Sequence, residues 1–182
     1  MNQEFTITAF SENSIGLLNR ITIIFTRRRL NIESLTVSAS AIRGIHKFTI
    51  VVNTTREQIE KVTLQIEKLV EVLKAYYHVN EELVYQEIAL YKVPTQALLD
   101  SSEVEHIIRR FGARILEVTH DFAVIEKTGH QDETAELFKA LDAFGVIQFT
   151  RSGRISIHRE KTEALQEHLS HVDKISRRRH LR

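Results

Sequence analysis

SENSIGLLNRITIIFTRRRLNIESL, residues 11–35, is the stretch on which the expected fold depends. Its centre predicts an amphipathic helix, because apolar residues recur at spacings of three and four: Leu17, Leu18, Ile21, Ile24 and Phe25. The polar turn 12–14 precedes this helix, which we expect to begin near Ser14 with Gly16 in its first turn. Three arginines at 27–29 end it, where cations favour the helix dipole. An extended segment follows from Asn31, so adaptable polar positions bracket a single helix.

Strands and a second helix surround this stretch. Residues 4–10 alternate as a half-buried strand does, and residues 32–41 and 45–52 predict a hairpin that turns at Arg43-Gly44. Thr54, with Glu57 three positions later, predicts a capping box at the start of the second helix. Residues 71–79 read as a fourth strand, which gives the order βαββαβ.

The same order repeats after a polar break at residues 80–82. A strand over 84–93 stops at Pro94, and a helix follows that should begin at a capping box of Ser102 and Glu105. Gly112 and Gly145 are expected to end the two helices of this half. The remaining strands are expected over residues 113–119, 122–127, 146–150 and 154–158.

The fold class is therefore α+β, with two tandem ferredoxin-like βαββαβ units, each an antiparallel sheet with helices on one face. The expected divisions are an N-terminal domain over 1–80, a C-terminal domain over 83–160 and a basic polar extension over 161–182. Units of this size bury a small share of their surface and leave sheet edges unpaired. We therefore expect an oligomer.

Composition narrows the class of protein. The 182 residues include no cysteine, which excludes thiol catalysis and suits a reducing cytoplasm. No apolar run is long enough to span a bilayer, and we see no signal peptide. Net charge is +1, but six basic and three acidic residues lie in 161–182, so the rest is mildly acidic. We expect a cytoplasmic protein without nucleic-acid or membrane partners.

No catalytic constellation is recognisable. There is no P-loop, G-x-S-x-G or G-x-G-x-x-G motif. The nine histidines are scattered, none has metal-ligand spacing, and His168 and His171 lack an evident third ligand. We expect surface histidines, no metal site and no enzymatic activity in the chain itself.

A binding site for a small anion is a more promising interpretation of the 12–18 turn. Free backbone N–H groups at the helix start favour a carboxylate, and Gly16 would let a ligand approach closely. Asn13 offers an amide donor and acceptor, while Leu17, Leu18 and Ile32 could form an aliphatic wall. Two structural alternatives stay open: Asn13 as the helix cap, and Gly16 as a position of close helix–sheet packing.

Four segments resemble a known family. Residues 12–20 resemble the N-x-x-G-x-L-x-R turn of ACT domains, and Asn31–Val37 (NIESLTV) closely resembles the second-strand motif of the acetolactate synthase regulatory (small) subunit family. The segment QIEKLVEVL at 65–73 and the run Arg151-Ser152-Gly153 are similar to further motifs of that family. The resemblance covers residues 4–159 and fits the repeated βαββαβ order.

The resemblance implies a non-catalytic regulatory subunit that activates a catalytic (large) subunit of acetolactate synthase. It also implies feedback inhibition by valine or another branched-chain amino acid. Thiamine diphosphate, Mg²⁺ and FAD would belong to the catalytic partner, with no cofactor in this chain. In the family, effectors bind where two ACT units pair, so Asn13, Gly16, Leu17 and Leu18 of one chain would face Asn31 and Ile32 of a second in a homodimer.

Two departures qualify the resemblance. The second unit has Pro94–Ser101 in place of the N-x-x-G turn, so we expect no effector site there. The tail beyond Arg159 matches no family motif. The main alternative function is a stand-alone ACT amino-acid sensor that regulates another metabolic or transcriptional protein, although no helix-turn-helix pattern is present. An enzyme in its own right ranks third.

Overall fold

The computed structural model describes residues 1–100 and 102–160. The described residues form two compact units, the first from Met1–Val84 together with residues 156–160, and the second from Tyr85–Ile155. The expectation of a basic polar extension over 161–182 lies outside the described residues.

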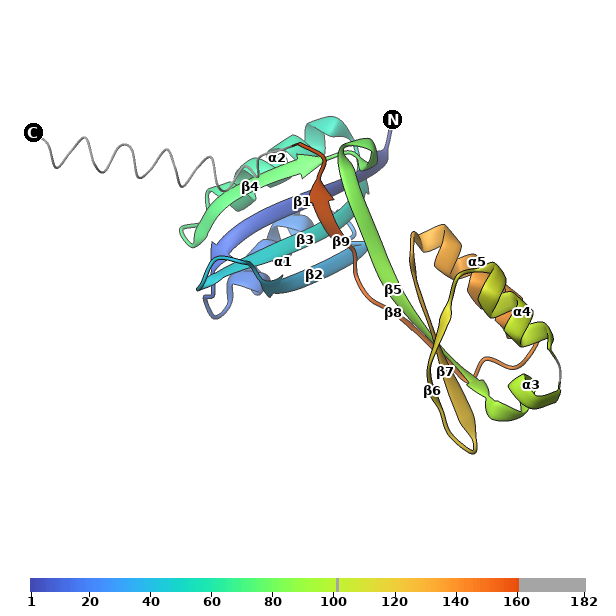
Figure 1. The fold of residues 1–182 in the computed structure, drawn as a ribbon. Coiled ribbons are helices and arrows are strands. Elements are labelled where there is room, and N and C mark those ends of the chain that lie inside the picture. Colours follow the sequence, from blue (N-terminus) through green and yellow to red (C-terminus); the bar gives the residue numbers. More distant parts are fainter. Residues whose placement is uncertain (101, 161–182) are drawn as a thin grey trace, which may run out of the picture. The chain divides into compact units, whose positions relative to one another are not determined.

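The first unit has the predicted βαββαβ order (Figure 1). Its elements are β1 (Gln3–Glu12), α1 (Leu17–Arg27), β2 (Ser34–Ala39), β3 (Ile45–Thr54), α2 (Arg56–Glu67) and β4 (Val72–His78), followed by the short 3-10 helix η1 (Asn80–Glu82). The antiparallel sheet has the strand order β2-β3-β1-β4, so β2 and β4 are its edges. The ferredoxin-like fold expected from the sequence is confirmed.

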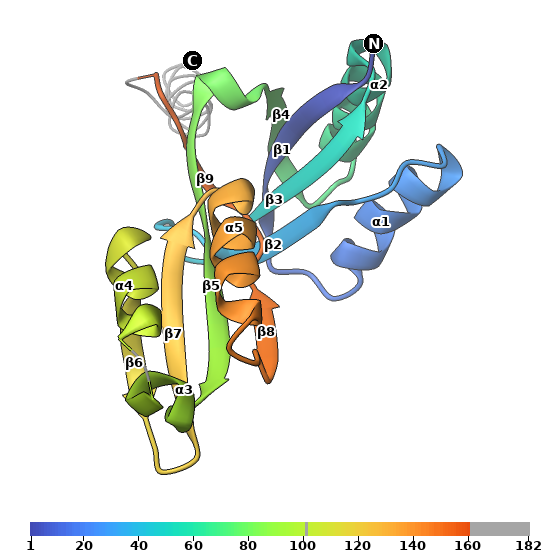
Figure 2. The same ribbon diagram turned by 90° about the vertical axis from the view of Figure 1, so that its right-hand side faces the viewer.

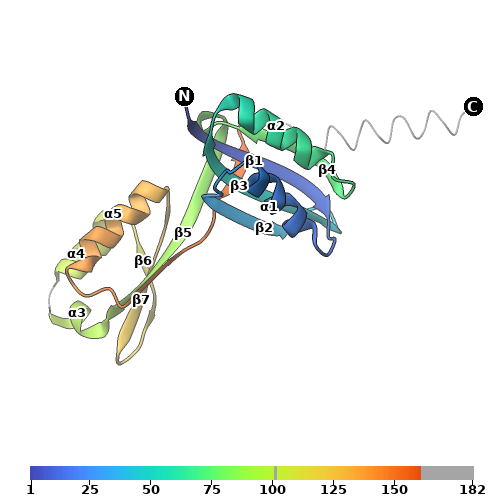
Figure 3. The same cartoon turned by 180° about the vertical axis from the view of Figure 1, so that it is seen from behind.

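Both helices of this unit cover one face of the sheet (Figure 3). α1 buries Leu17, Ile21 and Phe25, which follow the predicted stripe, and α2 buries its own stripe beside them. They pack on alternate residues of β1 and β3, including Phe5 and Ile50, in one continuous core. Full burial of each such side chain contributes about 1.5–3 kcal/mol to stability. The period of the sequence therefore determined which helix faces are buried.

The second unit is built in the same way (Figure 2). Its elements are β5 (Leu83–Pro94), α3 (Thr95–Asp100), α4 (Glu103–Arg110), β6 (Arg114–Val118), β7 (Phe122–Gly129), α5 (Gln131–Asp142), β8 (Gln148–Arg151) and β9 (Ile155–His158). The strand order is β6-β7-β5-β8, and β9 also pairs with β5. α4 and α5 bury their apolar residues against alternate positions of β5 and β7. The added helix α3 is the one element of this half that the sequence pattern did not predict.

The helix ends agree only in part with the sequence. Gly112 and Gly145 have φ values of 59° and 81°, as residues that end helices in the left-handed region do. The predicted capping box at Thr54 is wrong, because Thr54 is still paired in β3. Thr55 caps α2 instead, and its hydroxyl accepts the Gln58 N–H. Ser102 makes no side-chain cap to α4, so that prediction is also wrong.

The last strand, β9, pairs with β5 in the second sheet, as predicted for residues 154–158, but most of it also packs with the first unit. From Ser156 onward the described residues belong to the first unit. The Lys47 ammonium donates to the Ser156 carbonyl at 2.8 Å, and the Arg159 N–H donates to the Glu82 carbonyl at 2.9 Å. These bonds hold residues 156–160 on the first unit, where Figure 1 shows the end of β9 crossing the sheet face opposite to the helices.

Candidate functional site

The turn between β1 and α1 is shaped by backbone hydrogen bonds. The Ser14 N–H donates to the Glu12 carbonyl at 3.0 Å, and the Leu17 N–H donates to the Ser14 carbonyl at 3.3 Å. Gly16 follows with φ of 82°, in the left-handed region where a side chain adds strain. A Cβ at this position would meet no atom within 4 Å. The backbone angle, not close packing, therefore explains the glycine, and the space before it is open.

The start of α1 is uncapped by any side chain. Gly16 occupies the cap position, and its carbonyl accepts the first helical hydrogen bond from the Arg20 N–H at 3.1 Å. The N–H groups of Leu18 and Asn19 point out of the first turn, where helix geometry supplies no partner. Asn13 is exposed and does not cap the helix, so its amide is available to a ligand. This arrangement favours a small anion with further polar groups.

The aliphatic residues of the expected site differ in solvent exposure. Leu17, which was expected to line the site, is 2% exposed and packs in the core. Leu18 is 45% exposed at the same turn, and Ile32 is half-buried against the core. Ile15 was missed by the sequence reasoning, although its side chain is fully exposed in the turn. The signal for it was an isoleucine within a polar turn, outside the helical stripe.

Asn31 and Ile32 lie at the other end of α1. The Asn31 amide donates to the Glu33 carboxylate at 3.3 Å, and the side chain is exposed. The 11 residues of α1 separate this end from the turn, a length of about 16 Å at 1.5 Å per residue. One chain therefore does not bring the two groups of predicted site residues together.

The turn is fastened to β4 through Glu71. The Glu12 N–H donates to the Glu71 carbonyl at 3.0 Å, and the Arg20 guanidinium donates to the Glu71 carboxylate. This hydrogen bond from Arg20 holds the pKa of the Glu71 carboxyl below its usual range. Because Arg20 is already paired, the backbone N–H groups of α1 are the nearest donors for an anion in the turn.

β2 is an edge strand beside this region. It pairs with β3 on one side, and among the described residues no strand pairs with its other side. Val37 on β2 is 41% exposed, and Ile23 on the outer face of α1 is 38% exposed. An exposed edge with apolar neighbours is suited to pairing with a second chain.

Among its described residues, the second unit offers no equivalent turn. β5 ends at Pro94, and α3 begins at Thr95 without an intervening loop. The Thr95 hydroxyl is buried and donates to the Thr119 carbonyl at 2.8 Å. This geometry leaves no glycine-opened helix start comparable with that at Gly16.

Two histidines do not fit the expectation of scattered surface residues. His78 and His158 lie ring against ring, and their side chains are 17% and 16% exposed. Burial and the neighbouring His158 lower the pKa of His78.

Among residues 1–100 and 102–160, no helix combines the length and apolar character needed to cross a bilayer.

Comparison with known proteins matches both halves of the chain. Residues 7–74 match a family described as an AHAS small subunit-like ACT domain, and residues 86–160 match one described as the small subunit of acetolactate synthase. An acetolactate synthase small subunit from Bacillus subtilis is 35% identical over 84% of this chain and 89% of the relative. A probable acetolactate synthase small subunit from Archaeoglobus fulgidus is 33% identical over 85% of this chain and 96% of that one.

A solved structure agrees with these relatives. The crystal structure of an acetolactate synthase small subunit from Thermotoga maritima superposes with a TM-score of 0.79 at 28% identity. It covers 88% of this chain and 99% of its own. The similarity therefore extends through both units and is not limited to the N-terminal turn.

Proposed function

This chain belongs to the acetolactate synthase small-subunit family, and from that premise we propose that it activates a catalytic subunit and mediates its feedback inhibition. A small subunit implies a large catalytic partner. In our proposal that partner holds thiamine diphosphate, Mg²⁺ and FAD, and this chain supplies regulation alone. The effector is valine or a related branched-chain amino acid.

The observation that carries the effector proposal is the uncapped start of α1 behind Gly16. Unpaired N–H groups in the first turn suit the carboxylate of an amino acid. The Asn13 amide suits the polar atoms beside it, and the exposed Leu18 and Ile15 suit an aliphatic side chain. A lysine or aspartate side chain would find no complementary charge among these groups.

The second half of the site comes from another copy of the chain in this proposal. The turn and Asn31 lie at opposite ends of α1, so a ligand that contacts both must lie between two copies. Pairing through the exposed edge of β2 would supply such a dimer. Asn13, Gly16 and Leu18 of one copy would then face Asn31 and Ile32 of its partner.

The energetics of such a site are feasible. A dissociation constant of about 10 µM for valine corresponds to about 6.8 kcal/mol, or about 0.85 kcal/mol per heavy atom, below the ceiling of about 1.5 for small ligands. Inhibition further requires that valine bind one state of the assembly more tightly than another.

The test is reconstitution with the catalytic subunit of the same organism. Acetolactate formation is measured for the catalytic subunit alone, for this chain alone and for the mixture, each with and without L-valine. We expect activity from the catalytic subunit, more from the mixture, none from this chain, and inhibition of the mixture by L-valine but not by D-valine. Failure to copurify or to raise activity would favour the stand-alone amino-acid sensor.

A further inference from the structure

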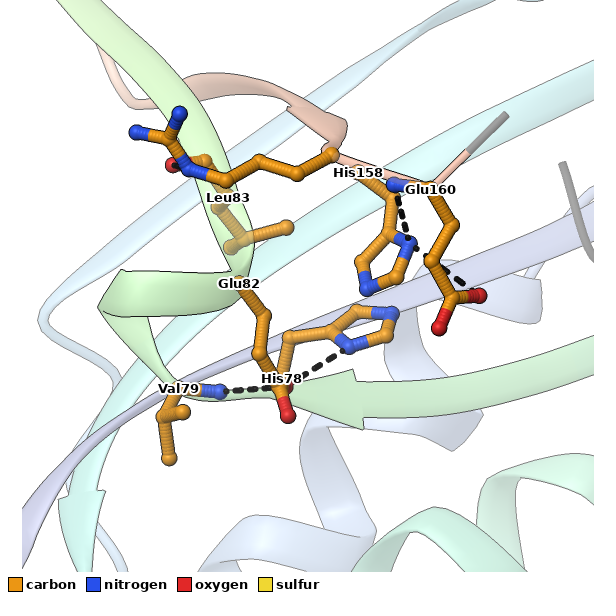
Figure 4. Close-up of polar contacts among 7 residues, drawn as sticks. His78, Val79, Glu82, Leu83, His158 and Glu160 are labelled. Carbon is orange, nitrogen blue, oxygen red and sulfur yellow. Dashed lines mark hydrogen bonds and ion pairs between the residues drawn. The ribbon is translucent and has the colours of Figure 1, made fainter. Parts of the chain in front are cut away.

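Three side chains of the first unit converge at the end of β4, where the sequence showed no motif (Figure 4). We propose that His78, Glu82 and His158 bind a divalent transition-metal ion of the Zn²⁺ class. Each residue offers one ligand atom, and these atoms all lie within 4.8 Å of one another. His78 ends β4, Glu82 ends η1 and His158 ends β9, so 80 positions of sequence separate the two histidines.

The ligands are held by hydrogen bonds of the surrounding backbone. The Glu82 carboxylate accepts the Val79 N–H at 3.2 Å and lies 3.0 Å from His78 Nδ1. The Arg159 N–H donates to the Glu82 carbonyl at 2.9 Å, and the Arg159 guanidinium donates to the Leu83 carbonyl at 3.1 Å. Residues on both sides of the cluster are thus tied together before any ion binds, which reduces the entropy lost on binding.

The packing of the two histidine rings and the exposure of the Glu82 side chain also suit the binding of a cation. The imidazole rings lie 4.0 Å apart between centroids and are tilted by 31°. Two protonated rings at this separation would repel each other. Neutral rings offer lone pairs that a metal can accept. The Glu82 side chain is 52% exposed, so an ion can enter from solvent on its side.

The ligand types select the metal. Two imidazole nitrogens with one carboxylate oxygen suit Zn²⁺, Ni²⁺ or Cu²⁺, whereas Mg²⁺ and Ca²⁺ prefer oxygen ligands alone. Tetrahedral Zn²⁺ with bonds of about 2.1 Å places its ligands about 3.4 Å apart. Side-chain rotations must therefore draw the ligand atoms somewhat closer on binding.

Glu160 adds a supporting group. Its N–H donates to His158 Nδ1 at 3.2 Å, which leaves the ring proton on Nε2. Metal binding at Nε2 would leave the ring proton on Nδ1, so the hydrogen bond from the Glu160 N–H would be lost, and the protonated Nδ1 could instead donate to the Glu160 carboxylate, now 3.6 Å away. Carboxylates that orient a metal-bound histidine in this way raise affinity. A bound ion would also fasten the end of β9 to β4.

The experiment titrates the full chain with ZnCl₂ by calorimetry, and with CoCl₂ while visible absorption is recorded. We expect one Zn²⁺ per chain at this site, a tetrahedral Co²⁺ spectrum and no binding of MgCl₂. His158→Gln and Glu82→Gln should each weaken Zn²⁺ binding at least about 100-fold, because three protein ligands fall to two. Glu160→Gln should weaken it about 10-fold.

Matched controls separate this site from other histidines. His106→Gln and His120→Gln replace exposed histidines and should leave Zn²⁺ affinity unchanged. The double variant His168→Gln/His171→Gln tests the histidine pair of the tail, and it should retain the Co²⁺ spectrum. Loss of binding in the tail variant, or wild-type affinity in a folded His158→Gln chain, would overturn the proposal. Circular dichroism verifies that each variant is folded.

Discussion

Arg20 on α1 is joined to Glu71, the residue just before β4 and 51 positions away, by a charged hydrogen bond. The carbonyl of the same Glu71 accepts the N–H of Glu12. A single residue just before β4 therefore holds both sides of the turn that contains Gly16. The shape of the proposed effector site depends on this long-range contact as well as on its own sequence.

Replacement of Glu71 by glutamine should remove a pH-dependent part of the stability of the wild-type chain. The pKa of Glu71 is lowered in the folded chain, chiefly by the Arg20 hydrogen bond, so its contribution is complete above the ordinary value of 4.5. That contribution is lost as the pH falls through the lowered folded-state pKa. Urea midpoints of wild type and Glu71→Gln should differ at neutral pH and converge in acid. In an Arg20→Gln background the difference should disappear; a difference unchanged by pH or by Arg20→Gln would contradict the pairing.

Gly16→Asp should weaken valine inhibition while activation of the catalytic subunit persists. The new carboxylate would stand where the effector carboxylate is proposed, and the charge effect is expected to be about 10-fold in the inhibitory concentration. Gly16→Asn is the matched control, since asparagine has the same size and also tolerates the left-handed backbone. Equal inhibition of the two variants by L-valine would argue against a carboxylate at this turn.

Mixed dimers test whether two chains share each site. A dimer of one Gly16→Asp chain and one Asn31→Ala chain should retain one intact site, because the unmodified turn of one chain meets the unmodified Asn31 of the other. A dimer of wild type and a chain with both changes should retain none. Calorimetric titration with L-valine counts the sites in purified, differently tagged pairs. The opposite pattern would mean that each chain forms a complete site alone.

Val37→Lys should weaken the homodimer. Val37 is 41% exposed on the edge strand β2, where a charge opposes pairing between sheets. Light scattering coupled to size exclusion should show the mass falling towards that of one chain at micromolar concentration. Leu64→Lys is the control, because Leu64 is 56% exposed on α2 and away from that edge. A dimer unaffected by Val37→Lys would place the interface elsewhere.

Tyr91→Phe should destabilise the second unit by about 1 kcal/mol, because the hydrogen bond that the Tyr91 hydroxyl donates to the Thr134 carbonyl is lost. Burial also raises the pKa of Tyr91 to about 12. The unfolded chain therefore ionises first, and wild type should lose stability as the pH rises from about 10 to 12. Tyr91→Phe should lack this loss. Chemical unfolding across that range measures it.

Much of the fold could be predicted from local pattern. Ile21 and Phe25 are buried where the helical period placed them, and Gly112 ends a helix as expected. The errors occur where a neighbouring strand decides the outcome. Thr54 is held in β3 by its pairing with Gln3, so the cap moves to Thr55.

The candidate site likewise has some features that the local sequence predicts and others that depend on tertiary packing. Asn13 and Gly16 lie in an open turn as the sequence indicated, because a positive φ is a local property of glycine. Leu17 was predicted to line the site, but it belongs to the same apolar stripe as Ile21, and its side chain is buried in the core. The helical spacing of apolar residues does not show which residue of a stripe is most deeply buried.

The two βαββαβ units, the family and the turn before α1 follow from the sequence alone, since they depend on hydrophobic period, glycine geometry and short motifs. The anchoring of the turn by Glu71, the return of residues 156–160 to the first unit and the contact of His78 with His158 are known only from the folded chain. These contacts join residues that are 51 to 109 positions apart, and no spacing rule along a chain specifies which distant side chains the folded sheet brings together.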